Sequence, residues 1–300
     1  MRFKMVSLIV GMALVCAAGS VLGATAYIVN ESKTIFTNST AGGAGSTLTT
    51  TLNNNARGID LYNNVLTTVV GGAKNWDNVT IPGGVVSNVG GIGRQWAGVV
   101  NQANGNYYML MDGNNNAVRI TSTFSNAGAV YPGSPQMEQG YSTGSDAEIF
   151  GSKAFFTSYD GNSSGQYLWS LSLGFASGTV AVAEFNAAPY GKNLSGIAFD
   201  GAGNVYLGVA NTKVIMLNSS FVYQSTIISG LSNVKDVDFF NNELYVCNSN
   251  GVSVYSLGGT LDRTFGPKNA TGLVVPEPSS IFGLLVGGTS LFGLLRRRAR

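Results

Sequence analysis

The chain contains no histidine, and this absence removes the side chain most used in catalysis and zinc binding. Without histidine there is no Ser-His-Asp or Cys-His arrangement and no zinc site of the common kind. Cysteine is also scarce: Cys16 lies in the apolar N-terminal stretch, which leaves Cys247 without an internal disulfide partner. Cys247 falls in a strand-like run and is expected to be a small buried apolar residue. These absences argue against nucleophilic enzymes.

Charged residues make up only 11% of the chain. Six of the 17 Lys and Arg lie in the first four and last five residues, which leaves 11 against 14 Asp and Glu in residues 27–276. The net charge of that middle region is therefore about −3. No basic cluster remains in its sequence, so the composition argues against a nucleic-acid surface.

The N-terminus has the three parts of a secretory signal peptide. Arg2 and Lys4 supply positive charge, residues 6–18 form an apolar run, and Ala24-Thr25-Ala26 is an A-x-A cleavage pattern. We expect residues 1–26 to direct the chain to the Sec translocon and to be removed by signal peptidase. What remains is long enough for one large β domain or two smaller ones.

The C-terminus combines a Pro-Glu-Pro motif, an apolar run and a basic end. The motif is Val275-Pro276-Glu277-Pro278, residues 281–295 carry no charge, and the basic residues that follow are Arg296, Arg297, Arg298 and Arg300. In helical form the apolar run extends roughly 23 Å, a short membrane span. The arginines are expected to remain in the cytoplasm. A core helix is disfavoured because the run is apolar on every face, whereas a permanent tail anchor stays open.

This tail resembles the PEP-CTERM sorting signal of Gram-negative bacteria in its motif, its apolar run and its arginines. The resemblance implies recognition by exosortase, an integral-membrane cysteine protease, with cleavage near the Pro-Glu-Pro motif. The protein would pass through an inner-membrane-anchored intermediate and then reach the cell surface or extracellular matrix. The expected organisation is a signal peptide over 1–26, a folded domain over 27–275, and a sorting signal over 276–300 with a transmembrane helix at 281–295.

The middle of the chain predicts an all-β fold. No stretch between residues 27 and 273 keeps a helical period, whereas short β-branched and aromatic runs alternate with Gly, Asn, Ser and Asp. A strand–turn–strand unit recurs, and a third strand follows most copies. Equivalent positions of the copies are Ile59, Val99, Ile149, Ile197 and Val237. A repeat of 40 to 50 residues with four strands is typical of a propeller blade.

A sixth copy comes from the two ends of the domain. Residues 26–37 match the second and third strands of a blade that lacks its first strand, and residues 270–275 supply a matching strand. We therefore predict a six-bladed β-propeller in which N-terminal strands complete the last blade. Such closure removes exposed sheet edges. A ring of five or seven blades and a pair of β-sandwiches are the alternatives.

One repeat resembles a known kind of blade. Residues 194–217, with the run Gly-Ile-Ala-Phe-Asp-Gly-Ala-Gly-Asn-Val-Tyr, are similar to NHL and gluconolactonase-type six-bladed propellers. For the lactonases the resemblance implies a divalent metal held by Glu, Asn and Asp side chains that face the central channel. The candidates in or beside first strands are Glu148, Asp60, Asp200, Asp236 and Asp238. Solvated or capping roles are the simpler interpretation, because no motif pairs these residues.

Two loops imitate calcium loops without completing them. Residues 160–165 begin like an EF-hand loop, but Leu171 stands where a bidentate Glu is needed. Residues 112–116 depart from the pattern as well, with Ala117 in the place of the glycine. Both loops are expected to be hairpin turns, and the sequence predicts no cofactor.

The sequence thus predicts an exported surface or matrix protein whose propeller binds rather than catalyses. Its expected partners are the Sec translocon, signal peptidase, exosortase and an exopolysaccharide or another surface polymer, but no nucleic acid. Membrane contact is expected only through the C-terminal helix before processing. Trp76, Trp96 and Trp169 either stack on sugars or pack between blades. A metal-dependent lactonase or related hydrolase on the same fold is the alternative function.

Overall fold

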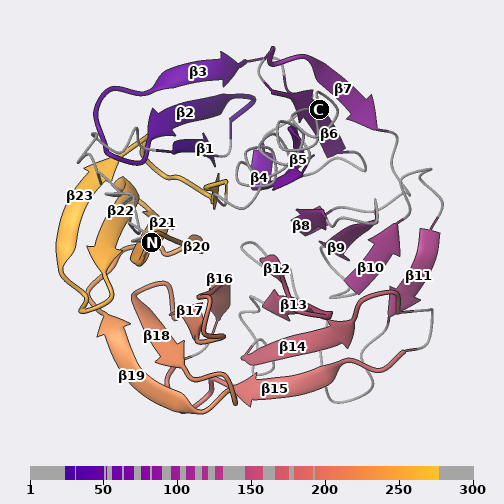
Figure 1. The fold of residues 1–300 in the computed structure, drawn as a ribbon, viewed down its shortest axis with the longest axis vertical. Coiled ribbons are helices and arrows are strands. Elements are labelled where there is room, and N and C mark those ends of the chain that lie inside the picture. The colour runs from indigo at the N-terminus through magenta and orange to yellow at the C-terminus, as the bar shows by residue number, and fades with distance from the viewer. Residues whose placement is uncertain are drawn as a thin grey trace, which may run out of the picture.

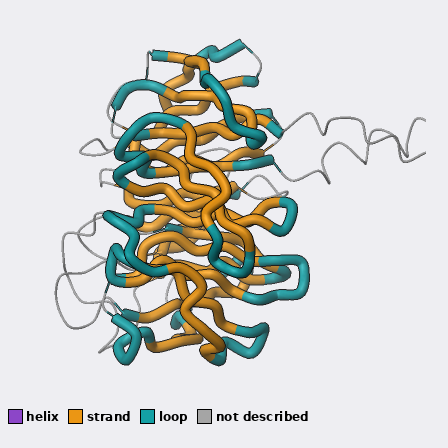
Figure 2. Tube along the Cα trace, turned by 90° about the vertical axis from the view of Figure 1, so that its left-hand side faces the viewer, coloured by secondary structure: helices purple, strands orange, loops and turns teal. Residues whose placement is uncertain are grey.

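The computed structural model describes residues 24–30, 32–50, 52, 56–62, 64–70, 76–81, 83–89, 96–101, 106–111, 117–120, 126–130, 146–157, 166–175, 179–191 and 193–276. The predicted signal helix, the predicted transmembrane helix, Glu277, Pro278 and the terminal arginines lie outside these residues. The described residues form strands and turns without a helix (Figure 2), so none of their elements is a helix that could cross a membrane.

Within the described part of the chain, the strands form six four-stranded antiparallel sheets arranged in a ring (Figure 1). Five of the sheets are consecutive in sequence. They are β4 (Ala56–Tyr62), β5 (Val65–Val70), β6 (Trp76–Thr80) and β7 (Val86–Val89); β8 (Trp96–Asn101), β9 (Tyr107–Met111), β10 (Ala117–Ile120) and β11 (Asn126–Val130); β12 (Ala147–Phe150), β13 (Lys153–Thr157), β14 (Tyr167–Ser172) and β15 (Val182–Asn186); β16 (Leu194–Phe199), β17 (Val205–Val209), β18 (Lys213–Leu217) and β19 (Tyr223–Ile228); and β20 (Asp236–Phe240), β21 (Glu243–Asn248), β22 (Gly251–Ser256) and β23 (Leu261–Phe265).

The remaining sheet joins the two ends of the domain, and we call it the closing sheet. Its strand order is β24 (Gly272–Val274), β1 (Thr25–Val29), β2 (Ile35–Ser39) and β3 (Ser46–Thr49). β24 runs antiparallel to β1, with Val274 opposite Tyr27 and Gly272 opposite Val29. This is the pairing that the sequence predicts between residues 270–275 and the N-terminal strand.

The first strand of each sheet lies toward the centre of the ring, as Figure 1 shows. These strands contact one another in ring order, from β4 through β8, β12, β16 and β20 to β24, and β24 contacts β4 again. The five equivalent positions of the sequence repeat all fall in first strands. The predicted all-β propeller is therefore confirmed.

Apolar side chains fill the spaces between neighbouring sheets. Phe155 and Leu168 pack with Ile197 and Leu207 of the next sheet in one continuous cluster. The second strands are covered on both faces, which is why β17 and β21 are almost entirely apolar and buried. The outer strand β19 instead alternates half-buried and exposed residues, because one of its faces meets solvent.

Local backbone geometry explains two features of the ring. The turn between β20 and β21 uses Asn241 and Asn242 at φ values of 52° and 62°, as the Asn-Asn dipeptide predicts for a tight hairpin. At Gly196 a Cβ atom would lie 2.0 Å from the backbone nitrogen of Val237. Only glycine therefore allows β16 and β20 to approach so closely beside the channel.

Strand direction gives the ring two faces. Each sheet contains four antiparallel strands, so the chain returns to its starting face before the next first strand begins, and all first strands run in the same direction. We call the face where β24 ends and β1 begins the exit face, because Pro276 and Ala24 lie there. The opposite face carries the connections between sheets and the turns between second and third strands, and we call it the connection face.

Candidate functional site

A carboxylate at the start of β12 joins two neighbouring sheets. Asp146 Oδ2 accepts the N–H of Ile197 in β16 at 2.9 Å, and its Oδ1 accepts the N–H of Ala147 at 2.8 Å. The hydroxyl of Thr157 accepts the N–H of Asp146 at 3.0 Å and donates to the carbonyl of Ser195. Asp146 and Thr157 thus bond the sheet of β12 to the sheet of β16.

The same arrangement occurs twice where the ring closes. Asp236 Oδ2 accepts the N–H of Leu273 at 2.7 Å, and Asp238 Oδ2 accepts the N–H of Val275 at 2.9 Å. The Oδ1 atoms accept the N–H of the residue that follows each aspartate, at 2.8 and 2.7 Å. Every oxygen of these two carboxylates therefore binds a backbone amide, and β24 is held from the side of β20.

Burial and mutual repulsion raise the pKa values of the channel carboxyls. Desolvation raises the pKa of Asp146 to about 6, although its bonds from backbone amides act in the opposite direction. Desolvation and then the charge of Asp146 raise the pKa of Asp236 well above its usual value. For Glu148, desolvation comes first, and the charges of Asp60, Asp238 and Asp146 raise its pKa further. These carboxylates come from different sheets and lie close enough to influence one another's pKa values near the centre of the ring, which we call the channel.

Four of the five candidate carboxylates of the sequence lie together in the channel, namely Glu148, Asp60, Asp236 and Asp238. Glu148, Asp60 and Asp238 interact there through their charges, and each side chain is half-buried. Even so, no group of three or more His, Cys, Asp or Glu among the described residues is arranged to hold a metal ion. The cluster is acidic without being a preformed metal centre.

Asp200 lies elsewhere. It follows β16 in the hairpin turn, where its Oδ1 accepts the N–H groups of Ala202 and Asn204 at 2.9 Å. Its Oδ2 accepts bonds from the Asn204 amide at 2.8 Å and the Tyr206 hydroxyl at 3.2 Å. The capping interpretation is therefore confirmed for Asp200, which stabilises a local turn.

Asp146 is not among the candidates that the apolar repeat pattern indicates, although the sequence holds a signal for it. The stretches Asp146-Ala147-Glu148 and Asp236-Val237-Asp238 place an acidic residue at the same two positions of a first strand. The first acidic residue of each stretch bonds the next sheet. Aligning the repeats on acidic residues as well as apolar ones would have identified it.

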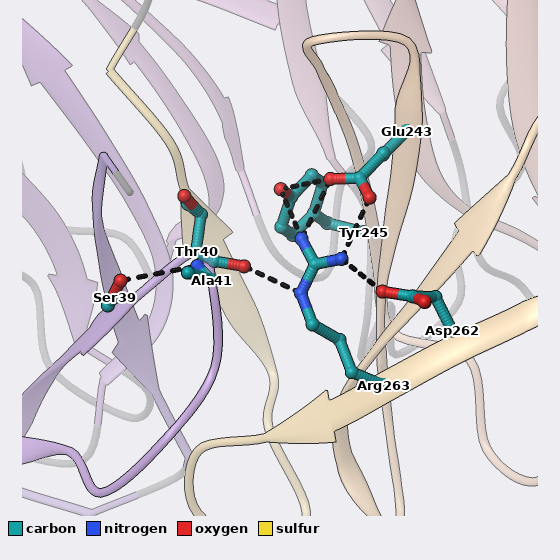
Figure 3. Close-up of polar contacts among 7 residues, drawn as sticks. All are labelled: Ser39, Thr40, Ala41, Glu243, Tyr245, Asp262 and Arg263. Atoms are coloured by element: carbon teal, nitrogen blue, oxygen red, sulfur yellow. Dashed lines mark hydrogen bonds and ion pairs between the residues drawn. The ribbon is translucent and has the colours of Figure 1, made fainter. Parts of the chain in front are cut away.

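The outer part of the ring closure depends on Arg263 in β23 (Figure 3). Its Nε donates to the carbonyl of Thr40 at 2.6 Å, which joins its sheet to the closing sheet. Its two terminal nitrogens donate to the two oxygens of Glu243 at 2.8 and 2.7 Å, and one of them also donates to the Tyr245 hydroxyl at 3.0 Å. These bonds lower the pKa of Glu243. The ion pair fixes the guanidinium for its bond across the sheets.

The residues of the predicted signal cleavage site belong to the closing sheet. Ala26 is fully buried in β1 opposite Asn38, and the carbonyl of Ala24 accepts the N–H of Thr40 at 2.8 Å. Cleavage after Ala26 would therefore remove the first two residues of β1.

Two of the three tryptophans that are candidates for stacking on sugars pack inside the fold. Trp76 and Trp169 are 0% and 4% exposed, so neither offers a ring to a ligand at the surface. The side chain of Trp96 lies outside the described residues. Cys247 is fully buried, as its apolar strand context predicts.

Neither a protein-family model nor a curated protein sequence matches this chain. Among solved structures, 1017 chains match, which marks a widespread architecture. One of them belongs to the crystal structure of a nidogen/laminin complex, with a TM-score of 0.70 and 11% identity over 84% of this chain and 97% of that chain. The likeness is one of fold. At this identity it supports the propeller and assigns no ligand.

Proposed function

We propose that this chain is an exported cell-surface or extracellular-matrix protein whose six sheets form a non-catalytic binding propeller. Residues 1–26 act as the signal peptide in this proposal. Residues 276–300 act as a PEP-CTERM signal, with a transmembrane helix over 281–295 that exosortase processing makes transient.

The position of the domain boundaries carries the proposal. β24 ends at Val274, the N–H of Val275 is held by Asp238, and Pro276 follows without an amide to continue the sheet. The Pro-Glu-Pro motif thus begins where the ring ends. At the other end, β1 begins at Thr25, beside the predicted signal cleavage site. The C-terminal segment can be removed without loss from the six sheets, whereas cleavage after Ala26 removes two residues of β1 and leaves Tyr27–Val29 paired with β24.

The chemistry of the channel supports binding over catalysis. Asp146, Asp236 and Asp238 use their oxygens for backbone amides of their own and neighbouring sheets, a structural task. The chain also lacks the histidine that would activate a nucleophile.

Substituting the sorting motif tests the proposal in the native host. Replacing Pro276, Glu277 and Pro278 by alanine should leave the ring folded but shift the protein from the surface fraction to the inner membrane. Cell fractionation with an antibody against the propeller measures this shift. Unchanged delivery to the surface would contradict exosortase sorting, and a cytoplasmic protein with an intact N-terminus would contradict export.

The acidic channel favours a second candidate, a metal-dependent lactonase or related hydrolase. Glu148 and Asp60 would be the first ligands to examine, because both face the channel charges. Metal analysis of the purified protein, together with lactone hydrolysis by the wild type and by Glu148→Gln, separates the two functions. Stoichiometric divalent metal and turnover that Glu148→Gln abolishes would replace the binding function with the hydrolase.

A further inference from the structure

Four of the described lysines gather on the connection face, opposite to the exit of the chain. Lys33 lies in the β1–β2 turn and Lys213 begins β18. Lys235 precedes β20, and Lys268 lies between β23 and β24. Lys33 and Lys268 are exposed, while Lys213 and Lys235 are half-buried. We call these four residues the lysine arc.

The segments that carry the lysine arc belong to neighbouring sheets and touch one another. Just before β20, the N–H of Val234 bonds the carbonyl of Asn211 in the β17–β18 turn at 3.0 Å. In the β1–β2 turn, the Asn30 side chain donates to the carbonyl of Lys268 at 3.3 Å. The arc therefore extends continuously over the sheets of β16 and β20 and the closing sheet.

The acidic residues are distributed differently. Near the connection face, Asp77 and Asp236 are buried, and both oxygens of Asp146 accept backbone amides. On the exit face, Asp262 is exposed and Asp200 is half-buried. Among the described residues, the connection face therefore carries exposed lysines without an exposed acidic side chain.

We propose that the lysine arc binds an acidic polysaccharide. This inference rests on the proposed surface location and names the ligand class of the propeller. The ammonium groups of Lys33, Lys213 and Lys268 are point charges spread over neighbouring sheets, an arrangement that suits a polymer with a repeated carboxylate better than one small anion. Each contact is weak and screened by salt, so affinity comes from many contacts along the polymer.

The position where the chain leaves the ring favours a polymer over a lipid bilayer as the ligand of the lysine arc. Pro276 lies on the exit face, and only residues 277–280 separate it from the apolar run at 281. Four extended residues reach at most roughly 14 Å. While the tail spans the membrane, the exit face is therefore the near face, and the lysine arc points away from the lipid. After release, the same face remains open to the matrix.

Binding of the full chain in mild detergent to polygalacturonate tests this inference, with neutral dextran as the reference polymer. We expect binding to polygalacturonate at low salt, no binding to dextran, and loss of binding at about 0.3 M salt. The triple variant Lys33→Gln, Lys213→Gln, Lys268→Gln should bind roughly tenfold more weakly. Lys153→Gln is the matched control, because Lys153 lies on the exit face and pairs with Glu184 at 2.6 Å; it should bind like the wild type.

Three results would overturn the inference: no binding to polygalacturonate, equal binding by the triple variant, or an equal loss in Lys153→Gln. Lysine-dependent binding to phosphatidylglycerol vesicles or to duplex DNA without binding to polygalacturonate would assign the arc to another partner. Circular dichroism of each variant confirms folding. Because the assay needs neither export nor processing, its failure is separate from a failure of the sorting proposal.

Discussion

The first strands β16 and β24 occupy equivalent places in the ring but are held in different ways. β16 continues through a hairpin into β17, and Asp146 and Thr157 each add one bond from the preceding sheet. β24 has only three residues and pairs with β1, from the other end of the chain. Two aspartates, Asp236 and Asp238, bond it from the preceding sheet. Where the hairpin is missing, two carboxylates rather than one accept backbone amides across the junction between sheets.

The rim of the ring shows the same contrast. The ion pair of Lys153 and Glu184 lies within one sheet. Arg263 instead bonds Thr40, which is 223 residues away in sequence and belongs to the closing sheet. Polar bonds thus hold together the two ends of the chain, where no covalent connection links the strands. We therefore expect substitutions at the ring closure to lower the free energy of unfolding more than equivalent substitutions elsewhere.

Removing β24 should have the largest effect. A chain that ends after Ala270 loses the β1 pairing, the burial of Leu273 and Val275, and their bonds to Asp236 and Asp238. We expect a loss on the order of 5 kcal/mol, enough to abolish cooperative unfolding in urea. The control chain ends after Pro276 and should unfold like the full domain. Equal unfolding midpoints for the two chains would contradict non-covalent closure of the ring.

Substituting the carboxylates tests the two bonds that Asp236 and Asp238 accept from the amides of Leu273 and Val275. The double variant Asp236→Ala, Asp238→Ala leaves two buried amides of β24 without acceptors and should cost about 2–4 kcal/mol of unfolding free energy. Asp146→Ala frees only the Ile197 amide between sheets and should cost about half as much. Urea unfolding at pH 5, where charge repulsion is reduced, measures both. A single variant as unstable as the double variant would remove the distinction between the two junctions.

The rim bonds should contribute less. Arg263→Lys keeps the charge but loses the fork that binds Glu243 and Thr40 together, at a cost of about 1 kcal/mol. Lys153→Gln should cost only a few tenths of a kcal/mol, because its pair is partly exposed and joins strands of one sheet. Thermal unfolding of the two variants compares them directly. A larger loss of stability in Lys153→Gln than in Arg263→Lys would show that bonds across the ring closure stabilise the fold no more than bonds within one sheet.

The smallest effect concerns pH. The raised pKa values of Asp146, Asp236 and Glu148 mean that the folded state binds their protons more tightly than the unfolded state does. The stabilising contribution of Asp146 is complete below its unfolded pKa, near 3.8, and is lost as pH rises through its folded pKa of about 6. The contributions of Asp236 and Glu148 are likewise lost as pH rises through their raised folded pKa values. The lowered pKa of Glu243 acts oppositely, since its contribution is lost as pH falls through its folded pKa.

Unfolding midpoints should therefore decline between about pH 5 and pH 7.5, and Glu148→Gln should flatten the decline. Glu243→Gln, in the rim, should leave the slope in this range unchanged. A wild-type unfolding midpoint that rises across the same pH range would mean that ionisation of the channel carboxyls does not destabilise the folded state.

The architecture could be predicted from the sequence because the strands of most sheets follow one another along the chain. The runs around Ile59 and Val237 could be aligned by their apolar residues and Asn-Asn turns, and residues 270–275 could be matched to the strand of Ile197. Partners across the ring could not be found in this way. Asp146 and Ile197 are 51 residues apart, and no local pattern indicates which strands become neighbours.

The candidate site was predicted only in part for the same reason. Asp238 and Asp200 look alike in sequence, each beside a first strand, yet one faces the channel and the other caps a turn. Asp238 lies one residue after Val237 and within β20, whereas Asp200 lies three residues after the equivalent Ile197 and outside β16. The lysine arc could not be predicted from the sequence because its residues are far apart along the chain. Only the strand directions in the structure show that they lie on one face.

The intact mass of the protein recovered from the cell surface tests most directly that the ring is an exported, processed domain. We predict a chain that has lost its signal peptide, retains Val275 and ends near the Pro-Glu-Pro motif, so that β24 stays in the closing sheet. A surface form that still carries Arg300, or one cut before Val275, would contradict this account.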